Sequence, residues 1–109
     1  MLKEHSYYSY LSTEDRMFLE FFTQPRRRAA AEFIRYYIRY QTFVGGEWKN
    51  VVEYDNCHDK MHQHFYDSLG IKGAAKILGP NDNPKRSFEE LKEHITILYT
   101  KYKRWYHHQ

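Results

Sequence analysis

The stretch that decides the fold is residues 32–55, EFIRYYIRYQTFVGGEWKNVVEYD. From Glu32 to Thr42 the sequence has a period of two, which places Arg35, Arg39 and Gln41 on one side and Ile34, Ile38 and Thr42 on the other. β-Branched and aromatic residues dominate, as is typical of a strand. Gly45-Gly46 supplies two residues that tolerate the positive φ of a tight turn. The chain then returns as a second strand from Glu47 to Asp55. These features predict a β-hairpin.

A shorter alternating segment follows the hairpin. Residues 61–66 predict a third strand, because side chains two positions apart point to the same face. One face then carries His62, His64 and Tyr66, and the other carries Met61, Gln63 and Phe65. Residues 70–84 hold three of the 5 glycines and two of the 3 prolines, so we expect this segment to be mostly loop.

Two segments predict helices. In the N-terminal segment Ser12 or Thr13 is a candidate cap, and helical spacing relates the apolar residues that follow, namely Met17, Phe18, Phe21 and Phe22. Pro25 ends this helix and begins a second short one over residues 25–31. Near the C-terminus Ser87 and Glu90 form a capping box. A 3,4,3,4,3 spacing then predicts an amphipathic helix over residues 88–105, through Phe88, Leu91, Ile95, Leu98, Tyr102 and Trp105.

Together these elements predict an α+β fold in a single domain, residues 1–109. A short antiparallel sheet over residues 32–66 (the hairpin plus the third strand) packs on the long C-terminal helix, and the N-terminal helix completes the core. The composition is that of a globular, soluble chain, with 41% hydrophobic and 28% charged residues. Aromatic residues reach 18%, so much of the packing must be aromatic. No apolar run is long enough to span a membrane.

The cysteine content and the N-terminal residues indicate the cellular location. Cys57 is the single cysteine, which excludes an internal disulfide framework. We interpret it as a small packing residue rather than a nucleophile. The first residues lack the apolar stretch of a signal peptide, so we expect a cytoplasmic location.

Positive charge is concentrated in two blocks of the chain. The net charge is +3, but residues 25–44 carry 5 basic against 1 acidic residue, and residues 71–109 carry 8 against 4, so each block is +4. Such blocks permit nucleic-acid binding. The candidate phosphate-binding residues are Arg26, Arg27, Arg28, Arg35, Arg39, Lys101, Lys103 and Arg104. The alternative is that they are solvated charges flanking helices.

The densest group of reactive side chains lies between residues 54 and 64. His58, His62 and His64 fall within seven residues, close to Asp55. Imidazole transfers protons near neutral pH, so these four residues are candidate catalytic groups for metal-independent RNA cleavage, with Arg35 or Arg39 neutralising the phosphate. The same four residues are alternatively candidate ligands for Zn²⁺ or another divalent metal. A third interpretation is a solvated strand end whose histidines have no special role.

The order of motifs resembles a known family. A strand with alternating tyrosines, Tyr36 to Gln41, precedes a glycine turn and Tyr54-Asp55-Asn56. His58, the His62-Gln63-His64 element, a proline-containing loop and Ser87-Phe88-Glu89-Glu90-Leu91 follow in that order. This order is similar to that of the TumE-type family, small prokaryotic proteins regarded as toxins of toxin–antitoxin modules. The similarity covers about residues 34–98.

The resemblance implies an α+β fold, a toxin-like role, a small antitoxin partner and action on RNA. Its matched positions are Asp55, Asn56, His58, His62 and His64. The chain departs from the family pattern at Glu53, where arginine is usual, and it begins with a predicted helix where the family has further strands. The link between the first histidine and the histidine pair is also shorter.

The functional hypothesis is therefore a toxin-like component of a prokaryotic toxin–antitoxin module, with ribonuclease activity that uses His/Asp acid–base chemistry. The alternative is a non-catalytic module that binds nucleic acid or protein and that holds a metal at a His/Asp site. The expected partners are a small antitoxin protein and RNA, with no membrane. No cofactor other than a divalent metal is indicated, and the sequence leaves a homo-oligomer open.

Overall fold

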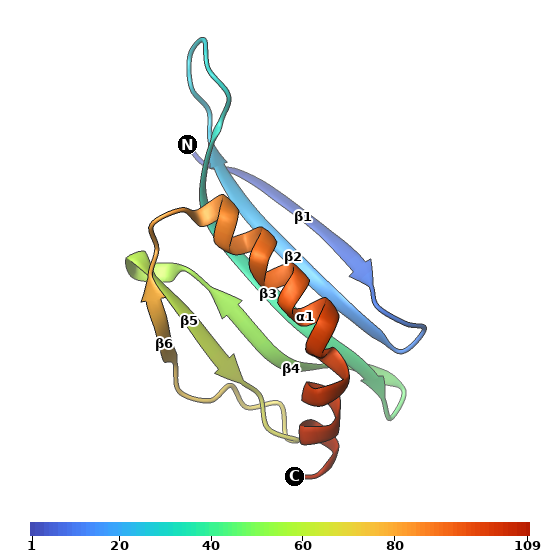
Figure 1. Cartoon of the computed structure of the whole chain (residues 1–109). Helices are drawn as coiled ribbons and strands as arrows, with labels where there is room; N and C mark the ends of the chain where they lie inside the picture. The colour runs from blue at the N-terminus through green and yellow to red at the C-terminus, as the bar shows by residue number, and fades with distance from the viewer.

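A computed structural model describes the whole chain, residues 1–109, as one antiparallel sheet and one long helix (Figure 1). Six strands pair in the order of the sequence, each with the next. They are β1 (Lys3–Tyr10), β2 (Asp15–Gln24), β3 (Glu32–Val44), β4 (Glu47–Asp55), β5 (Lys60–Phe65) and β6 (Lys76–Pro80). A short 3₁₀ turn, η1 (Cys57–Asp59), joins β4 to β5, and the helix is α1 (Pro84–His107).

The predicted α+β fold is wrong in two respects. The sheet has six strands rather than three, and there is no N-terminal helix. Residues 15–24 form β2, in which Met17 and Leu19 are buried, and residues 25–31 form a loop rather than a second helix. The predicted loop over residues 70–84 contains β6. The hairpin, the third strand and the C-terminal helix are confirmed by β3, β4, β5 and α1.

The apolar residues of β2 explain the mistaken helix. Met17, Phe18, Phe21 and Phe22 satisfy a helical spacing, but Met17, Leu19 and Phe21 also satisfy the alternation of a strand. β3 offers an unpaired edge whose N–H and C=O groups need partners. Pairing of β2 along nearly the whole of β3 satisfies these groups, and β1 then pairs with the free edge of β2. Tertiary pairing therefore overrides the local pattern.

The helix α1 begins four residues earlier than the sequence pattern predicts. The Asn83 side chain accepts a hydrogen bond from the Arg86 backbone N–H at 3.1 Å, and Pro84 occupies the first turn. Ser87 is therefore not the cap; its hydroxyl lies 2.9 Å from the Tyr36 hydroxyl. The polar residues of α1 also rule it out as a membrane span, since the chain has no helix that is both long and apolar enough.

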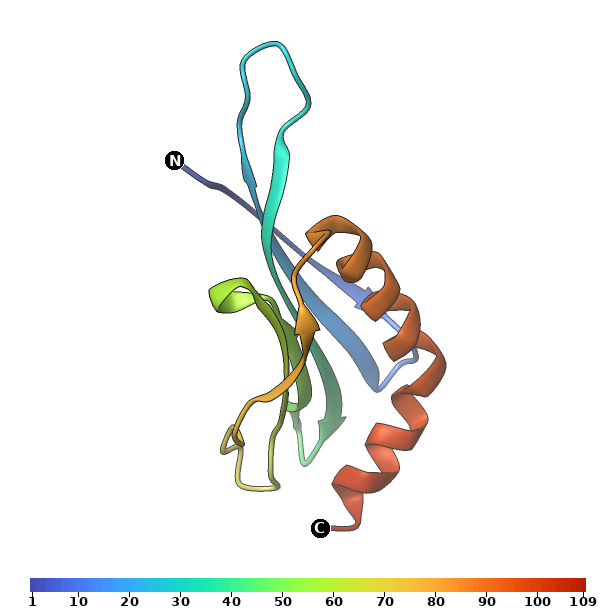
Figure 2. The same ribbon diagram turned by 60° about the vertical axis from the view of Figure 1, so that its left-hand side comes forward.

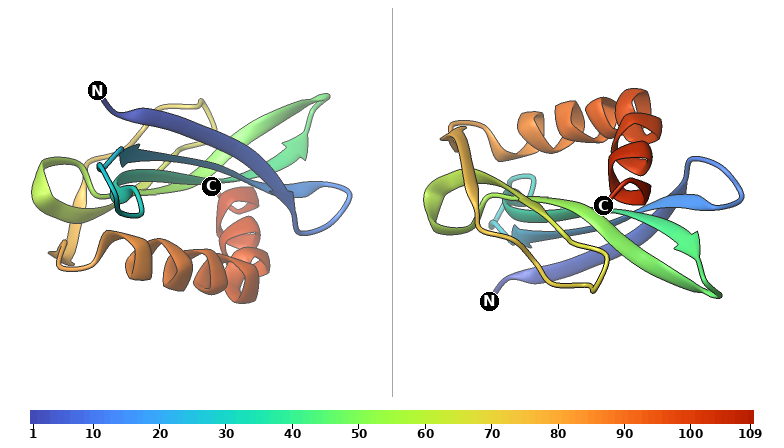
Figure 3. Two further views of the ribbon diagram at one scale, coloured as in Figure 1. Left: turned by 90° about the horizontal axis from the view of Figure 1, so that it is seen from above. Right: turned by 90° about the horizontal axis from the view of Figure 1, so that it is seen from below.

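The sheet has one covered and one open face. α1 lies across one side only, which we call the covered face (Figures 2 and 3). The main core forms there, and it consists of Met17, Leu19, Tyr36, Ile38, Tyr40, Val51, Val52, Tyr54, Phe88, Ile95 and Tyr106. We call the opposite side the open face. Because strand side chains alternate, Arg39, Glu53 and Asp55 point to the open face.

Candidate functional site

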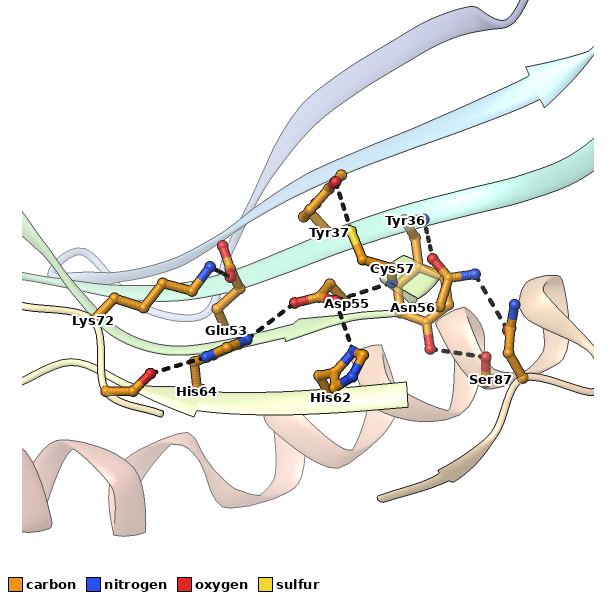
Figure 4. A network of polar contacts seen from close by, with 12 residues as sticks. Tyr36, Tyr37, Glu53, Asp55, Asn56, Cys57, His62, His64, Lys72 and Ser87 are labelled. Carbon is orange, nitrogen blue, oxygen red and sulfur yellow. Dashed lines mark hydrogen bonds and ion pairs between the residues drawn. The ribbon is translucent and has the colours of Figure 1, made fainter. Parts of the chain in front are cut away.

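A cluster of charged side chains occupies the open face where β4 meets β5. The register pairs Asp55 with His62 and Glu53 with His64, so two carboxylates face two imidazoles across neighbouring strands. The prediction that His62 and His64 share a face is confirmed by this register. Both carboxylates are buried, with Glu53 0% and Asp55 3% exposed. Figure 4 shows their side chains beside those of His62 and His64.

The Asp55 carboxylate lies between the two imidazoles. Its Oδ1 is 3.3 Å from His62 Nδ1, and its Oδ2 is 3.5 Å from His64 Nε2. Oδ1 also accepts the backbone N–H of Cys57 at 3.0 Å. An ionised carboxylate can only accept hydrogen bonds, so His62 donates from Nδ1 and its Nε2 is left to take up a proton. This is the geometry of a histidine base oriented by an aspartate.

His64 is held differently from His62. Its Nδ1 lies 3.0 Å from the backbone carbonyl of Gly73, which can only accept, so Nδ1 carries a proton. Its Nε2 faces the Asp55 carboxylate. Both ring nitrogens of His64 therefore face groups that accept hydrogen bonds, the Gly73 carbonyl and the Asp55 carboxylate.

Glu53 is neutralised by two cations. Its Oε1 accepts a hydrogen bond from Arg39 Nε at 2.6 Å, and its Oε2 forms an ion pair with Lys72 without a well-aligned hydrogen bond. Burial opposes the charged form of each cation. The Glu53 carboxylate outweighs that effect and raises the pKa of both Arg39 and Lys72. The Glu53 carboxylate thus faces two positively charged side chains, Arg39 and Lys72.

The connection between β4 and β5 is locally strained. His58 and Asp59 both adopt left-handed backbone conformations, with φ of 58° and 61°, which cost free energy in residues other than glycine. The Asn56 side chain anchors the connection: its Oδ1 accepts the Tyr36 backbone N–H at 2.8 Å, and its Nδ2 donates to the Ile34 carbonyl at 3.0 Å. Strain of this kind is concentrated at functional sites.

A surface cavity of about 400 Å³ opens over the cluster. Its wall is formed by Tyr37, Asp55, Cys57, His58, His62, His64, Lys72 and Ala75. The Tyr37 hydroxyl lies 2.9 Å from the Cys57 thiol. Burial, followed by this contact, raises the pKa of Tyr37 to about 12, so its hydroxyl stays protonated at neutral pH. The cavity thus brings together all four of the predicted catalytic residues.

The residues that fit a metal differ from the predicted ligand set. Ligand atoms of Glu53, Asp55 and His64 lie within 4.8 Å of one another, but His58 and His62 are not in this group. A divalent cation here would have to displace the Lys72 ammonium from Glu53. Because Arg39 and Lys72 already neutralise Glu53, the cluster suits a divalent metal poorly.

The predicted phosphate-binding residues do not form one surface. Arg26, Arg27 and Arg28 lie in the β2–β3 loop, which extends beyond one end of the sheet, whereas Lys101 and Arg104 lie near the C-terminal end of α1 at the opposite end (Figure 1). Lys103 forms an ion pair with the buried Asp15 at 3.1 Å. Of the eight candidates, only Arg39 contacts the Glu53–Asp55 cluster.

Sequence reasoning missed three members of the site, namely Glu53, Lys72 and Tyr37. Glu53 had a signal, since it stands two residues before Asp55 on the same strand and thus on the same face. Lys72 had none, because it comes from the β5–β6 connection, 19 residues away from Glu53, and that segment carries no periodic pattern. Tyr37 is brought to Asp55 by the β3–β4 register.

Comparisons with known proteins identify a family. A family model described as "Domain of unknown function (DUF7718)" matches residues 1–108. No curated protein and no solved structure matches the chain.

Proposed function

The chain belongs to this DUF7718 family of domains of unknown function, and we propose that it is a metal-independent ribonuclease. The observation that carries the proposal is the Asp55 carboxylate between His62 and His64, at 3.3 and 3.5 Å, beneath an open cavity that Lys72 also lines. A histidine base beside several cations suits attack on a phosphodiester, which is anionic and becomes more so in the transition state.

The residues take distinct roles in this reaction. His62 Nε2 removes the proton of a ribose 2′-hydroxyl, and the resulting oxygen attacks the adjacent phosphorus. The bond from phosphorus to the 5′-oxygen breaks, and His58, whose exposed ring lines the same cavity, protonates that oxygen. The products are a 2′,3′-cyclic phosphate and a free 5′-hydroxyl. Asp55 keeps His62 in the tautomer that leaves Nε2 available.

The positive groups stabilise the phosphate. Lys72 lines the cavity and supplies the charge of its ammonium group there, and the His64 ring lines the same cavity. Arg39 lies beneath them, paired with Glu53. Groups that are already held in place lose little freedom when charge develops on the phosphate oxygens, which is why preorganised charges are effective.

Within this proposal the chain acts as the toxin of a prokaryotic toxin–antitoxin pair and is neutralised by a small antitoxin protein. The order of sequence motifs supports this role. The expected result is that expression of the chain arrests growth of a bacterial host and that His62→Ala removes the effect. Growth arrest that persists with His62→Ala would contradict a toxicity based on RNA cleavage.

The decisive experiment measures RNA cleavage in the presence of EDTA and identifies the new ends. We expect wild type to produce 2′,3′-cyclic phosphate ends and His62→Ala to be slower by roughly 10²–10⁴-fold, the usual contribution of a general base. Gln63→Ala is the matched control, because the neighbouring Gln63 donates to the Tyr54 hydroxyl on the covered face at 2.7 Å. We expect it to cleave at nearly the wild-type rate.

Melting temperatures are measured for the same variants, and they distinguish a loss of catalysis from a loss of folding. His62 contacts one buried group through a partly exposed ring, so His62→Ala should remain folded at the assay temperature. A folded His62→Ala variant that cleaves RNA as fast as wild type would overturn the proposal. Cleavage that EDTA abolishes would instead favour the metal alternative at Glu53, Asp55 and His64.

A further inference from the structure

The half of the open face that lies away from the cavity has an unusual composition. Within residues 6–10, 16–20 and 37–43, the side chains that point to the open face are aromatic, charged, amide or hydroxyl, and none of them is aliphatic. We call the aromatic residues of this region, together with the arginine that lies among them, the aromatic strip. It consists of Tyr8, Tyr10, Arg16, Phe18, Phe43 and Trp48. Three of these rings are well exposed, with Tyr8 at 50%, Tyr10 at 61% and Phe43 at 42%.

Arg16 organises the strip. Its guanidinium lies 4.1 Å from the centroid of the Tyr8 ring and 4.0 Å from that of the Trp48 ring. Its Nε donates to the Gln41 side chain at 2.7 Å, which fixes the guanidinium in place. Planar rings and a planar cation are therefore already arranged on the surface, and both stack on nucleic-acid bases.

The strip continues into the cavity. Cross-strand pairing sets Tyr8, Phe18, Arg39, Glu53 and His64 in a single row from β1 to β5. With neighbouring strands about 4.8 Å apart, this row is about 19 Å long. A sheet face of similar width, the four-stranded sheet of RNA-recognition domains, stacks two or three bases on its aromatic residues.

Charge along the strip suits a polyanion. Arg16 lies within the strip, and Arg39 is its charged neighbour toward the cavity, with the Arg39 guanidinium 5.9 Å from the Phe18 ring centroid. The acidic residues of β1 and β2 on this face, Glu4 and Glu20, lie together on the flank toward the β2–β3 loop. A strand that crosses from Tyr8 to Arg39 therefore passes to one side of them.

We propose that the aromatic strip binds single-stranded RNA and leads it into the cavity at His62 and His64. This inference rests on the proposed ribonuclease activity and names its substrate: unpaired bases stack on Tyr8, Phe18 and Trp48 while the backbone runs toward Arg39 and Lys72. Duplex RNA fits poorly, because its bases are stacked on one another and their faces are not available.

Single-stranded RNA accounts for the strip better than a protein partner does. Tyrosine, tryptophan and arginine are common at the centre of protein interfaces as well, so the location of the strip decides between the two partners. The strip runs along the sheet through Arg39 into the cavity, which Lys72 lines, and this continuity favours an anionic ligand. A protein contact, including a second copy of the chain, is therefore treated as an outcome of the test.

The experiment measures the affinity of a fluorescein-labelled, 2′-O-methylated single-stranded RNA by fluorescence anisotropy at low salt. The methyl groups prevent cleavage, so binding is measured apart from catalysis. We expect Tyr8→Ala to weaken binding by roughly 5- to 150-fold, the effect of losing one base–aromatic stack. Tyr8→Phe should bind nearly as wild type. The matched control is Tyr7→Ala, because Tyr7 is the next residue of β1, is 39% exposed and points to the covered face.

The outcomes separate this inference from the ribonuclease proposal. Binding that depends on Tyr8 but not on Tyr7, and that is weaker for a duplex of the same sequence, supports the inference whether or not unmodified RNA is cleaved. Equal affinities for Tyr7→Ala and Tyr8→Ala would overturn it, even if His62-dependent cleavage is found. A dimer seen by sedimentation that Tyr8→Ala dissociates, with no RNA binding, would assign the strip to a protein contact and overturn it as well.

Discussion

The two faces of the sheet are formed by the same strands and hold the molecule together in different ways. The covered face is packed against α1 by apolar residues such as Leu19, Ile38 and Ile95, each 0% exposed. The open face has no second layer, and its buried groups include the carboxylates Glu53 and Asp55, which side-chain cations and imidazoles surround. Burial on one face is by packing, and on the other it is by charge pairing.

The difference teaches where chemistry can be located in a chain of this size. A carboxylate on the covered face must be sealed by the core, as Asp15 is by the Tyr40 hydroxyl at 2.6 Å and Lys103 at 3.1 Å. Asp55 is equally buried, but its partners are imidazoles that line a cavity. A buried aspartate on the covered face thus has a structural role. A buried aspartate on the open face can act on a ligand through the imidazoles that it contacts.

The largest expected effect tests the packing of the covered face. Leu19→Ala should lower the free energy of unfolding by about 2–5 kcal/mol, because it leaves a cavity under α1. The neighbouring Phe18 points to the open face and is only partly buried, so Phe18→Ala should cost about 1 kcal/mol. Urea denaturation measures both. Equal losses for the two variants would show that the open face is as tightly packed as the covered one.

An intermediate effect tests the charge pairing of the open face. Glu53→Ala should cost about 1–3 kcal/mol, since Arg39 and Lys72 lose their carboxylate. Both cations keep access to water, with side chains 33% and 41% exposed, so the cost stays below that of a pair sealed in a core. Glu53→Gln removes the charge but keeps the shape of the side chain, so it serves as the control for lost packing in the same urea experiment. Wild-type stability of Glu53→Ala would mean that the cluster does not support the fold.

The smallest expected effect is a pH dependence on the covered face. Burial opposes ionisation of Asp15, but hydrogen bonds from Tyr40, Ser12 and Lys103 outweigh it and lower the pKa below the ordinary 3.8. The ionised form is therefore favoured by folding. Its stabilisation is complete above the unfolded pKa and is lost as the pH falls through the lower folded pKa.

Melting curves recorded between pH 2 and pH 7 check this expectation. Asp15→Asn should be less stable than wild type by about 1–2 kcal/mol at neutral pH, and the difference should shrink as the solution is acidified. A difference that is constant over the whole range would show that the Asp15 charge contributes nothing and that only the shape of the side chain matters.

Part of the fold could be predicted because its signals are local. The alternation over residues 32–42 and Gly45-Gly46 define β3, β4 and the turn, and the 3,4 spacing after Phe88 defines α1. β1 and β2 could not be assigned in this way. The apolar residues of β2 fit both a helix and a strand, and the choice depends on the unpaired edge of β3, which a local pattern does not contain.

The candidate site divides along the same line. The period of a strand predicts that His62 and His64 share a face, and their closeness in the sequence to Asp55 suggests a common site. Which groups complete the site depends on pairing between strands and on the path of the β5–β6 connection. The register sets Glu53 opposite His64, and that connection carries Lys72 back to Glu53.

The sequence by itself determined the chemical inventory of this protein and the periodicity of its strongest elements. It supplies the histidines, the carboxylates and the aromatic residues, and alternation sorts those of each strand into two sets. Only the tertiary structure decided which set is buried under a second layer and which stays open. The physical reason is that one helix can cover only one face of a sheet, so the placement of α1 assigns packing to one set of side chains and leaves the other for binding and chemistry.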